Sequence, residues 1–448
     1  MAPMVPRVAP SSSYCYCSAK GALNLNPMKK KKLRVGVLFG GRSGEHEVSL
    51  LSAASILKAI DRKKYEVIPI GITKEGQWLR GGEAQRLLAG DFGVAGLGAG
   101  DEPDGAGEVA LEEVEFAAAA AVLRSGEELH IPPPAHASLP QTIELSASAE
   151  MAQPSSPLAG SLDVIFPVLH GTFGEDGTIQ GLLELADVAY VGSSVLGSAA
   201  AMDKDAMKRL FAAAGLPQTP HLTLLRSAWR ADAKKCTKAI EKALKYPMFV
   251  KPANLGSSVG ISKVHARGEL AAAMDLAASF DRKLVVEQGV GGPGVKSREL
   301  EVSVLGNDTP EASVVGEIVP NREFYDYESK YAAAPENPSI PIIPAKLTKA
   351  EIKQVREMAL AAFKACDCAG LARVDFLMEP ESKGKGKKKA KPRIFVNEIN
   401  TMPGFTSISM YPKLWGASGL TYKKLIDRLI ELAVERQREK HQTRFSKS

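Results

Sequence analysis

Long apolar runs and ordered cysteine patterns are both missing from this chain of 448 residues. No apolar run approaches the ~18 residues that a membrane helix needs, so we expect no membrane partner. The five cysteines (Cys15, Cys17, Cys236, Cys366 and Cys368) match no zinc pattern and no disulfide framework. Reduced thiols in a reducing compartment are therefore expected, with the cytoplasm as the location.

The chain also lacks the clustered basic charge that binds nucleic acid. Its net charge of +6 comes largely from two lysine-rich stretches, at 29–32 and 383–391, and the rest is near neutral. A solvated tail and a solvated loop explain both stretches. We therefore expect no nucleic-acid partner.

Acidic residues are absent from positions 1–32, which we expect to form a disordered leader. A leader free of Asp and Glu is typical of a transit peptide, which would place the protein in the plastid stroma. The alternative is a chain that starts at Met28, because a Lys run followed by a strand is an ordinary start. We favour this second interpretation.

The order of the elements predicts two folded parts. A strand, loop, helix and strand over 33–72 indicate a parallel, Rossmann-like α/β sheet in an N-terminal domain at 33–202, interrupted by a low-complexity insertion at about 90–160. Residues 203–437 read as an α+β unit with antiparallel sheets on both sides of a cleft. Its central part covers about 220–290 and its C-terminal part about 291–437, and a tail at 438–448 follows.

The helices that we expect lie between these strands. Apolar spacing with Gly or Pro stops predicts them at 48–60, 178–185, 202–214, 231–244, 269–278, 348–365 and 422–439. A hairpin is expected at 108–122 and a long loop at about 320–344.

Two short strands near the C-terminus carry the clearest chemical signal. Side chains alternate along a strand, so Arg373 and Asp375 share one face of the first strand, and Glu398 and Asn400 share one face of the second. If the strands pair, three oxygen ligands converge beside a guanidinium group. Such ligands suit Mg²⁺ that also holds nucleotide phosphates. The alternative is a structural salt bridge between the strands.

A second pattern predicts phosphate binding. Lys251 ends a strand and is followed by a turn at 256–260 that contains Gly256, Ser257 and Ser258, whose small residues let backbone N–H groups approach a phosphate. The turn is not a Walker P-loop, and a plain Gly/Ser hairpin is the alternative. Lys204 could be a second phosphate cation or a solvated helix lysine. Glu287 could accept from a ribose or an adenine amine, or be a surface carboxylate.

The first Gly-rich loop fails the test for a dinucleotide site. Gly40 and Gly41 are followed by Glu45 and Glu47, which would repel a pyrophosphate. An acid held at a helix N-terminus can bind a substrate ammonium, although helix capping is the alternative. His170 follows a buried strand, where it could face a ligand or be a structural histidine.

Six motifs taken together resemble one known family. They occur in order over about residues 33–437, and the sequence is similar to the D-alanine–D-alanine ligase family of the ATP-grasp superfamily through segments 40–49, 170–177, 251–260, 324–331, 373–375 and 397–406. The resemblance implies an enzyme that joins two D-alanines through a D-alanyl phosphate, releasing ADP and phosphate, for peptidoglycan precursor synthesis. It also implies a homodimer.

The resemblance assigns roles toward ATP and metal. The phosphates would lie near Lys204, Lys251, Gly256 and Ser258, and the adenosine near Glu287 and Glu299. Asp375, Glu398 and Asn400 would hold two Mg²⁺ or Mn²⁺ ions per site. The loop that contains Pro293 is longer than the family pattern, which puts Glu299 in doubt.

The resemblance also assigns roles toward D-alanine. Glu45 would bind the ammonium of the first D-alanine and His170 would lie near its carboxylate, while Arg373 and the Gly404 N–H would stabilise developing charge. The second D-alanine's carboxylate would lie between Ser409 and Lys330. Tyr331, Ser257 and Glu45 would form a hydrogen-bonded network that closes a lid over the site.

Three rival functions can be weighed on the same residues. A non-catalytic nucleotide-binding regulator should have lost one of Lys251, Arg373, Asp375 or Glu398, and all are present. A kinase-like phosphotransferase would not need Glu45, Ser409 and Tyr331 together. Relatives that join D-alanine to D-lactate carry a different lid residue where Tyr331 stands.

Overall fold

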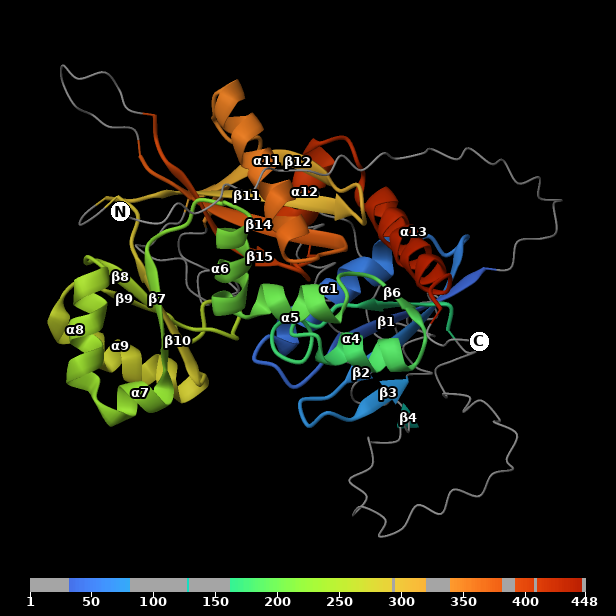
Figure 1. The fold of residues 1–448 in the computed structure, drawn as a ribbon. Coiled ribbons are helices and arrows are strands. Elements are labelled where there is room, and N and C mark those ends of the chain that lie inside the picture. Colours follow the sequence, from blue (N-terminus) through green and yellow to red (C-terminus); the bar gives the residue numbers. More distant parts are fainter. Residues whose placement is uncertain are drawn as a thin grey trace, which may run out of the picture. The chain divides into compact units, whose positions relative to one another are not determined.

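The fold is that of a computed structural model, which describes residues 32–80, 127–128, 162–291, 295–319, 339–380, 391–406 and 409–444 (Figure 1). Within these ranges no helix is both long and apolar enough to cross a membrane. The described strands form three sheets of six, four and five strands. The expected leader, most of the insertion at 90–160 with its hairpin at 108–122, and most of the loop at 320–344 lie outside the described residues.

The first sheet carries the N-terminal part of the chain. Its order is β4-β3-β2-β1-β5-β6. Four strands are parallel, namely β1 (Leu33–Gly40), β2 (Tyr65–Ile72), β5 (Val164–Pro167) and β6 (Ala189–Tyr190). Two short edge strands, β3 (Trp78–Arg80) and β4 (Glu127–Glu128), are antiparallel. The expected parallel sheet is confirmed for the first four strands, whereas the sheet as a whole is mixed.

Three helices accompany this sheet. They are α1 (His46–Ala59), α4 (Thr178–Leu185) and α5 (Val195–Met202). The buried face of α1 packs on β1 because its apolar residues recur at helical spacing, as with Leu50, Ala53 and Leu57. The sequence prediction placed α1 and α4 correctly to within two residues but missed α5.

The second sheet forms the central part, in the order β7-β10-β8-β9 with all neighbours antiparallel. Its strands are β7 (His221–Leu225), β8 (Met248–Pro252), β9 (Ser262–Val264) and β10 (Lys283–Gln288). Three helices belong to the same region: α7 (Arg226–Ala231), α8 (Ala233–Ala243) and α9 (Arg267–Phe280). Ile240 of α8 and Met274 of α9 share one buried core with Val250 and Val286 of the sheet.

The third sheet has the order β13-β12-β11-β14-β15 and is also antiparallel. Its strands are β11 (Arg298–Gly306), β12 (Glu311–Val319), β13 (Ile340–Ile342), β14 (Gly370–Met378) and β15 (Ile394–Asn400). Its core includes residues of α6 (Lys204–Ala213) and α11 (Lys349–Ala365), and α12 (Met410–Ala417) and α13 (Tyr422–Lys440) follow in the chain. The two antiparallel sheets predicted for residues 203–437 are therefore confirmed.

The helix expected at 202–214 corresponds to α6, but it begins two residues later than predicted. Asp203 separates α6 from the preceding helix α5. Asp203 is extended (φ −77°, ψ 103°) and its side chain caps α6 by accepting from the backbone N–H groups of Asp205 and Ala206. An N-cap aspartate preceded by apolar residues was read as helix interior, although Asp favours the cap.

The last helix ties the C-terminal part of the chain to the first sheet. Leu425, Leu429 and Leu432 of α13 lie in the same buried core as Val37 of β1 and Phe166 of β5. Figure 1 shows α13, in red, beside the blue N-terminal elements. This packing makes the first sheet and the C-terminal helix one structural unit.

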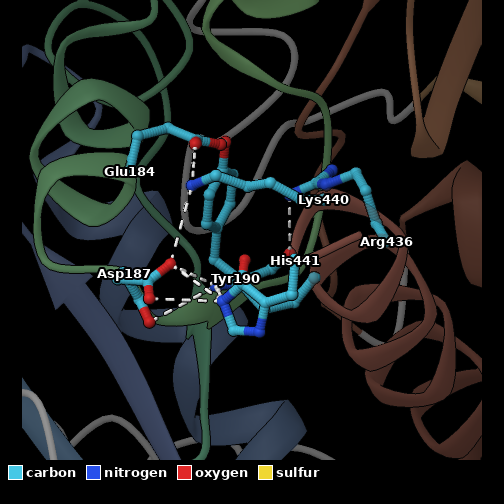
Figure 2. Close-up of polar contacts among 7 residues, drawn as sticks. Glu184, Asp187, Tyr190, Arg436, Lys440 and His441 are labelled. Atoms are coloured by element: carbon cyan, nitrogen blue, oxygen red, sulfur yellow. Dashed lines mark hydrogen bonds and ion pairs between the residues drawn. The ribbon is translucent and has the colours of Figure 1, made fainter. Parts of the chain in front are cut away.

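Polar contacts fix the far end of the same helix (Figure 2). The Arg436 guanidinium lies over the Tyr190 ring, 4.4 Å from its centroid. It donates to the carbonyl oxygens of Gly192 and, at 3.0 Å, Tyr190. Lys440 pairs with Glu184, and His441 Nε2 lies 3.1 Å from Asp187 Oδ1.

Candidate active site

The predicted convergence on β14 and β15 is present. Arg373 pairs with Asn400 and Asp375 with Glu398 in the strand register, and a bulge follows Asp375. Arg373 donates from Nε and Nη2 to the two oxygens of Asp375, both at 2.7 Å. The Asn400 amide donates to Asp375 Oδ2 at 3.0 Å. The four side chains therefore meet on one face of the sheet, as the alternation predicts.

Carboxylates hold the buried guanidinium in its charged form. Arg373 Nε also lies 3.1 Å from Glu301 Oε2 on the neighbouring strand β11. Burial by itself would lower the pKa of Arg373, but Asp375 and Glu301 outweigh it and raise the pKa well above its usual range. A permanent positive charge is thus fixed beside Asp375 and Glu398, the two carboxylates expected to bind metal, which we call the metal-type carboxylates. Glu301 was not anticipated from the sequence, although its position on a strand opposite Asp375 is the signal.

A cavity of about 260 Å³ opens between the two antiparallel sheets. The central sheet contributes Lys251 and Glu287, and the third sheet contributes Glu299, Asp375 and Glu398. Ser258 of the Gly/Ser turn lies at the same cavity. Of the residues expected at the nucleotide, Lys251, Ser258, Glu287 and Glu299 line this cavity, the last despite the longer loop before it, whereas Lys204 and Gly256 do not.

The Gly/Ser turn adopts the backbone conformation that anion-binding turns need. Ser257 and Ser258 have φ of 48° and 61°, and Gly260 has φ of 71°. Successive residues in this left-handed region can turn their N–H groups toward one concavity. A non-glycine residue held at positive φ is uncommon, so two consecutive serines there make an ordinary hairpin a poorer explanation.

Lys204 lies at the first position of α6 and is buried rather than solvated. Its Nζ donates to the Leu255 carbonyl at 2.7 Å and lies 3.9 Å from Glu398 Oε2. Its own backbone N–H donates to the Ala253 carbonyl at 3.0 Å. The start of α6 thus connects the segment before the Gly/Ser turn with the metal-type carboxylates.

Glu287 is a buried carboxylate between two lysines, not a surface group. Its Oε1 lies 3.2 Å from Lys251 Nζ and 3.3 Å from Lys208 Nζ. Burial disfavours the ionised form, but the two ammonium groups outweigh it and lower the pKa of Glu287 to about 2. Lys208 was not singled out from the sequence. The signal was its place four residues after Lys204, which puts both on one helix face.

Glu45 stands at the start of α1 but does not cap that helix through its side chain. A Cβ on Gly171 would lie 3.1 Å from Glu45 Oε1, and a Cβ on Gly256 only 2.5 Å from it. Two glycines from distant parts of the chain therefore leave room for this carboxylate. Helix capping does not account for Glu45, which instead faces the Gly/Ser turn. Glu47, by contrast, forms an ion pair with Lys74 at the surface.

His170 is fully enclosed by protein groups. Its Nδ1 contacts the Met402 carbonyl at 2.9 Å and its Nε2 contacts Ser52 Oγ at 3.0 Å. Burial lowers its pKa, so the ring is neutral at neutral pH. These contacts give His170 a structural role, because they join helix α1, through Ser52, to the segment that contains Met402. Its contact with a substrate carboxylate stays a prediction.

Glu175, in the same motif as His170, was not assigned a role from the sequence. It accepts from the backbone N–H groups of Gly171 at 2.8 Å and Met402 at 3.3 Å. Burial, together with the nearby Glu45 charge, raises its pKa to about 8. Glu175 thus joins the loop that holds His170 to the segment that leads to Gly404.

Gly404 and Ser409 lie next to each other. A Cβ on Gly404 would be 2.9 Å from Ser409 Oγ, so the glycine leaves room for this hydroxyl close to the backbone. Ser409 Oγ accepts from the Thr406 N–H at 3.0 Å and contacts Thr406 Oγ1 at 2.8 Å. Lys330 and Tyr331, the expected lid residues, lie outside the described residues, so their roles stay predictions.

Two models of known protein families match this chain. Residues 34–193 match the family described as "D-ala D-ala ligase N-terminus", and residues 210–431 match "D-ala D-ala ligase C-terminus". The chain belongs to the D-alanine–D-alanine ligase family. The resemblance drawn from the six motifs is confirmed.

Named relatives extend the match over nearly the whole chain. A D-alanine–D-alanine ligase of Natranaerobius thermophilus is 46% identical over 93% of this chain and 100% of its own length. One from Chloroherpeton thalassium is 46% identical over 92% of this chain and 99% of its own length. Both domains of the relatives are therefore represented here.

Solved structures agree with the fold. The D-alanine–D-alanine ligase from Coxiella burnetii is 33% identical with a TM-score of 0.67, over 92% of this chain and 96% of that one. A D-Ala:D-Ser ligase, VanG of Enterococcus faecalis, is 31% identical with a TM-score of 0.67, over 90% of this chain and all of that one. One solved structure similar to this chain is thus named for D-alanine and D-serine.

Proposed function

We propose that this chain joins two D-alanines to D-alanyl-D-alanine at the expense of ATP, releasing ADP and phosphate, for peptidoglycan precursor synthesis. One observation carries the proposal. The turn that contains Gly256 lies against Glu45 on one side, and its Ser258 lines the cavity of Lys251, Glu287 and Asp375 on the other. The proposed nucleotide site and the proposed ammonium-binding site would thus share one wall.

The reaction requires activation of a carboxylate, which by itself is a poor electrophile. The first D-alanine's carboxylate oxygen attacks the γ-phosphorus of ATP, the bond to ADP breaks, and a D-alanyl phosphate forms. The amine of the second D-alanine then attacks the carbonyl carbon, loses a proton, and displaces phosphate. Glu45 would hold the first ammonium, and Lys204, Lys251 and the turn with Gly256 and Ser258 would hold the phosphates.

Charge develops on the carbonyl oxygen as the amine attacks. Arg373, whose guanidinium is fixed by Asp375 and Glu301, and the Gly404 N–H are the donors that we place there. The neighbour of Gly404, Ser409, would position the second carboxylate together with Lys330. Tyr331, Ser257 and Glu45 would complete a lid that keeps water from the acyl phosphate.

The donor set fits a divalent cation. Asp375, Glu398 and Asn400 offer two carboxylates and an amide oxygen on one face of paired strands. No group of three His, Cys, Asp or Glu suited to a metal occurs among the described residues. When bound, Mg²⁺ or Mn²⁺, with two ions per site, compensates the triphosphate charge.

Location and assembly complete the proposal. We place the enzyme in the cytoplasm, and the relatives named above give no support to the plastid alternative. A homodimer remains an implication of the family resemblance.

Substrate choice is the decisive test. A coupled phosphate-release assay should show turnover with ATP, Mg²⁺ and D-alanine, and product analysis should find D-alanyl-D-alanine. The relative named for D-serine makes D-serine the required competitor, and D-lactate tests depsipeptide formation. No phosphate release with D-alanine alone would overturn the proposal. If a mixture of D-alanine and D-serine were turned over faster, with the mixed dipeptide as main product, the second substrate would be D-serine instead of D-alanine.

A further inference from the structure

We infer that Lys208 is a positioning residue for the nucleotide: by sharing the Glu287 carboxylate, it leaves Lys251 available to bind phosphate. This inference rests on the proposed function, because it assumes that ATP occupies the cavity between the sheets. Lys208 contributes nothing to that cavity's lining, whereas Lys251 and Glu287 both line it.

The geometry places the carboxylate between two ammonium groups. Lys208 and Lys251 approach the same oxygen, Glu287 Oε1, at 3.3 and 3.2 Å. The other oxygen, Oε2, accepts from Thr219 Oγ1 at 3.4 Å. The three ionised groups together carry one positive charge. If Lys208 were neutral, Lys251 and Glu287 would form a closed pair with no net charge to offer a phosphate.

Lys208 is an expensive residue to keep in this position. Its side chain is 1% exposed, and within the described part of the chain its Nζ has no hydrogen-bond acceptor of good geometry. Burial lowers its pKa, which the Glu287 carboxylate opposes. A buried charge of this kind destabilises a fold unless it is paired. A methionine would fill the same space without that cost, so packing does not explain the lysine.

The position of Lys208 on α6 connects it with Lys204. Four residues separate them, so both lie on one face of the helix. Lys204 lies toward Glu398, at 3.9 Å, and Lys208 toward Glu287. One helix therefore supplies a cation to each end of the cleft, one toward the metal-type carboxylates and one behind the nucleotide wall.

Nucleotide titrations with single and double variants test the inference. Binding of ADP with Mg²⁺ is measured by calorimetry for the wild type, Lys208→Met, Glu287→Gln, Lys251→Met, Lys208→Met/Glu287→Gln and Lys208→Met/Lys251→Met. We expect Lys208→Met to weaken ADP binding by about tenfold. Because Glu287 is itself expected near the adenosine, the double variants are compared with Glu287→Gln alone and with Lys251→Met alone. In each of these two backgrounds, removal of Lys208 should change ADP affinity by less than about twofold.

Arg209→Met provides the matched control, because Arg209 lies on the same helix with a side chain 76% exposed. This variant should bind ADP as the wild type does, and the KM for D-alanine should stay unchanged in Lys208→Met while the KM for ATP rises. ADP affinity of Lys208→Met within twofold of the wild type would overturn the inference. So would a loss on removing Lys208 that is as large in the Glu287→Gln background as in the wild type, which is the result expected of a purely structural lysine.

The titrations need no D-alanine, so the two claims fail separately. A wild type that binds ADP but makes no dipeptide would refute the proposed function and leave the role of Lys208 testable. Should Lys208→Met unfold, Lys208→Gln provides a neutral polar replacement for the same comparison.

Discussion

At the scale of single residues, the strongest contacts of the site lie where strand alternation places them. Arg373, Asp375, Glu398 and Asn400 follow from the sequence because side chains two apart share a face, whatever the rest of the fold does. Glu175 and Lys208 do not follow, because their significance comes from partners far away in the chain, Met402 and Glu287. A buried charge is visible only once its surroundings are known.

Glu398 is the residue whose loss should matter most to turnover. Glu398→Gln removes one metal-type carboxylate while keeping its shape, so the triphosphate charge loses compensation. We expect kcat to fall by at least about a hundredfold, the scale of losing one preorganised electrostatic contact. Phosphate release measured with saturating ATP and D-alanine checks this.

The control lies on the same pair of strands. Glu379 follows β14, pairs with Arg393 near the surface and lies away from the cavity lining. Glu379→Gln should therefore keep kcat within about twofold, since surface ion pairs contribute little. Near-normal turnover by Glu398→Gln would contradict the metal assignment.

Glu175 should make the stability of the protein depend on pH. Its pKa is raised to about 8 by burial and by Glu45, so between pH 4.5 and 8 the folded state holds a proton that the unfolded state has lost. Stability contributed by this group therefore falls as pH rises through that window. The glutamine in Glu175→Gln cannot ionise, so the variant should not lose this stability as pH rises.

Thermal unfolding of both proteins across that pH range gives the measurement. The Tm of Glu175→Gln minus that of the wild type should increase steadily from pH 5 to pH 8, since one pKa unit corresponds to about 1.4 kcal/mol. Glu175→Gln also changes the hydrogen bonds to the backbone N–H groups of Gly171 and Met402, which lowers its Tm by the same amount at every pH. The decisive quantity is therefore how the Tm difference changes with pH, and not its size at any one pH. A gap independent of pH would show that Glu175 is ionised in the fold.

At the scale of elements, regular periodicity predicted most helices and strands, and the missed ones, such as α5, α7, α12 and β7, have eight residues or fewer. The helix expected at 202–214 begins only at Lys204, because Asp203 caps α6 and also faces Lys283 and Asn254. Its tertiary partners override an apolar pattern that continues through it. The strand β7 was missed since its five residues are only partly buried and carry a weak alternation.

Asp203 should couple the stability of α6 to nucleotide binding. Asp203→Ala removes the cap, at a cost of about 0.5–2 kcal/mol, and also the contact to Asn254. Since Asn254 precedes Leu255, the acceptor of Lys204, the KM for ATP should rise by several-fold. Asp203→Asn keeps a capping oxygen and should recover the stability more than the KM.

A second cap elsewhere separates the two effects. Thr348 caps α11 through a capping box with Glu351. Thr348→Ala should cost about 1 kcal/mol of stability and leave the KM for ATP unchanged. If Thr348→Ala raised that KM as much as Asp203→Ala, loss of stability alone would explain both.

At the scale of the whole molecule, the C-terminal helix α13 packs against the N-terminal sheet. The order of elements predicts three sheets, but nothing local says that α13 packs on the first sheet, because that core joins residues nearly 400 positions apart, such as Val37 and Leu429. The same holds for the site, whose walls come from α1, the Gly/Ser turn and β14–β15. Motif order indicates the family, whereas only the fold shows which motifs touch.

The contact between α13 and β6 should be a main source of whole-molecule stability (Figure 2). Arg436 stacks on the Tyr190 ring and satisfies the carbonyls of Tyr190 and Gly192. Arg436→Ala would leave those acceptors without this donor, at about 1–3 kcal/mol, and would also remove the stacking. Urea unfolding should show a lower midpoint for Arg436→Ala. The kcat measured at urea concentrations below the unfolding transition should stay within about twofold, since Arg436 is not part of the cavity lining.

The control is His441→Ala, one turn further along the helix, where the half-exposed His441 faces Asp187. This change should alter the free energy of unfolding by about 0–1 kcal/mol. Equal losses in the two variants would mean that the exposed ion pairs, and not the half-buried guanidinium, hold the C-terminal helix to the first sheet.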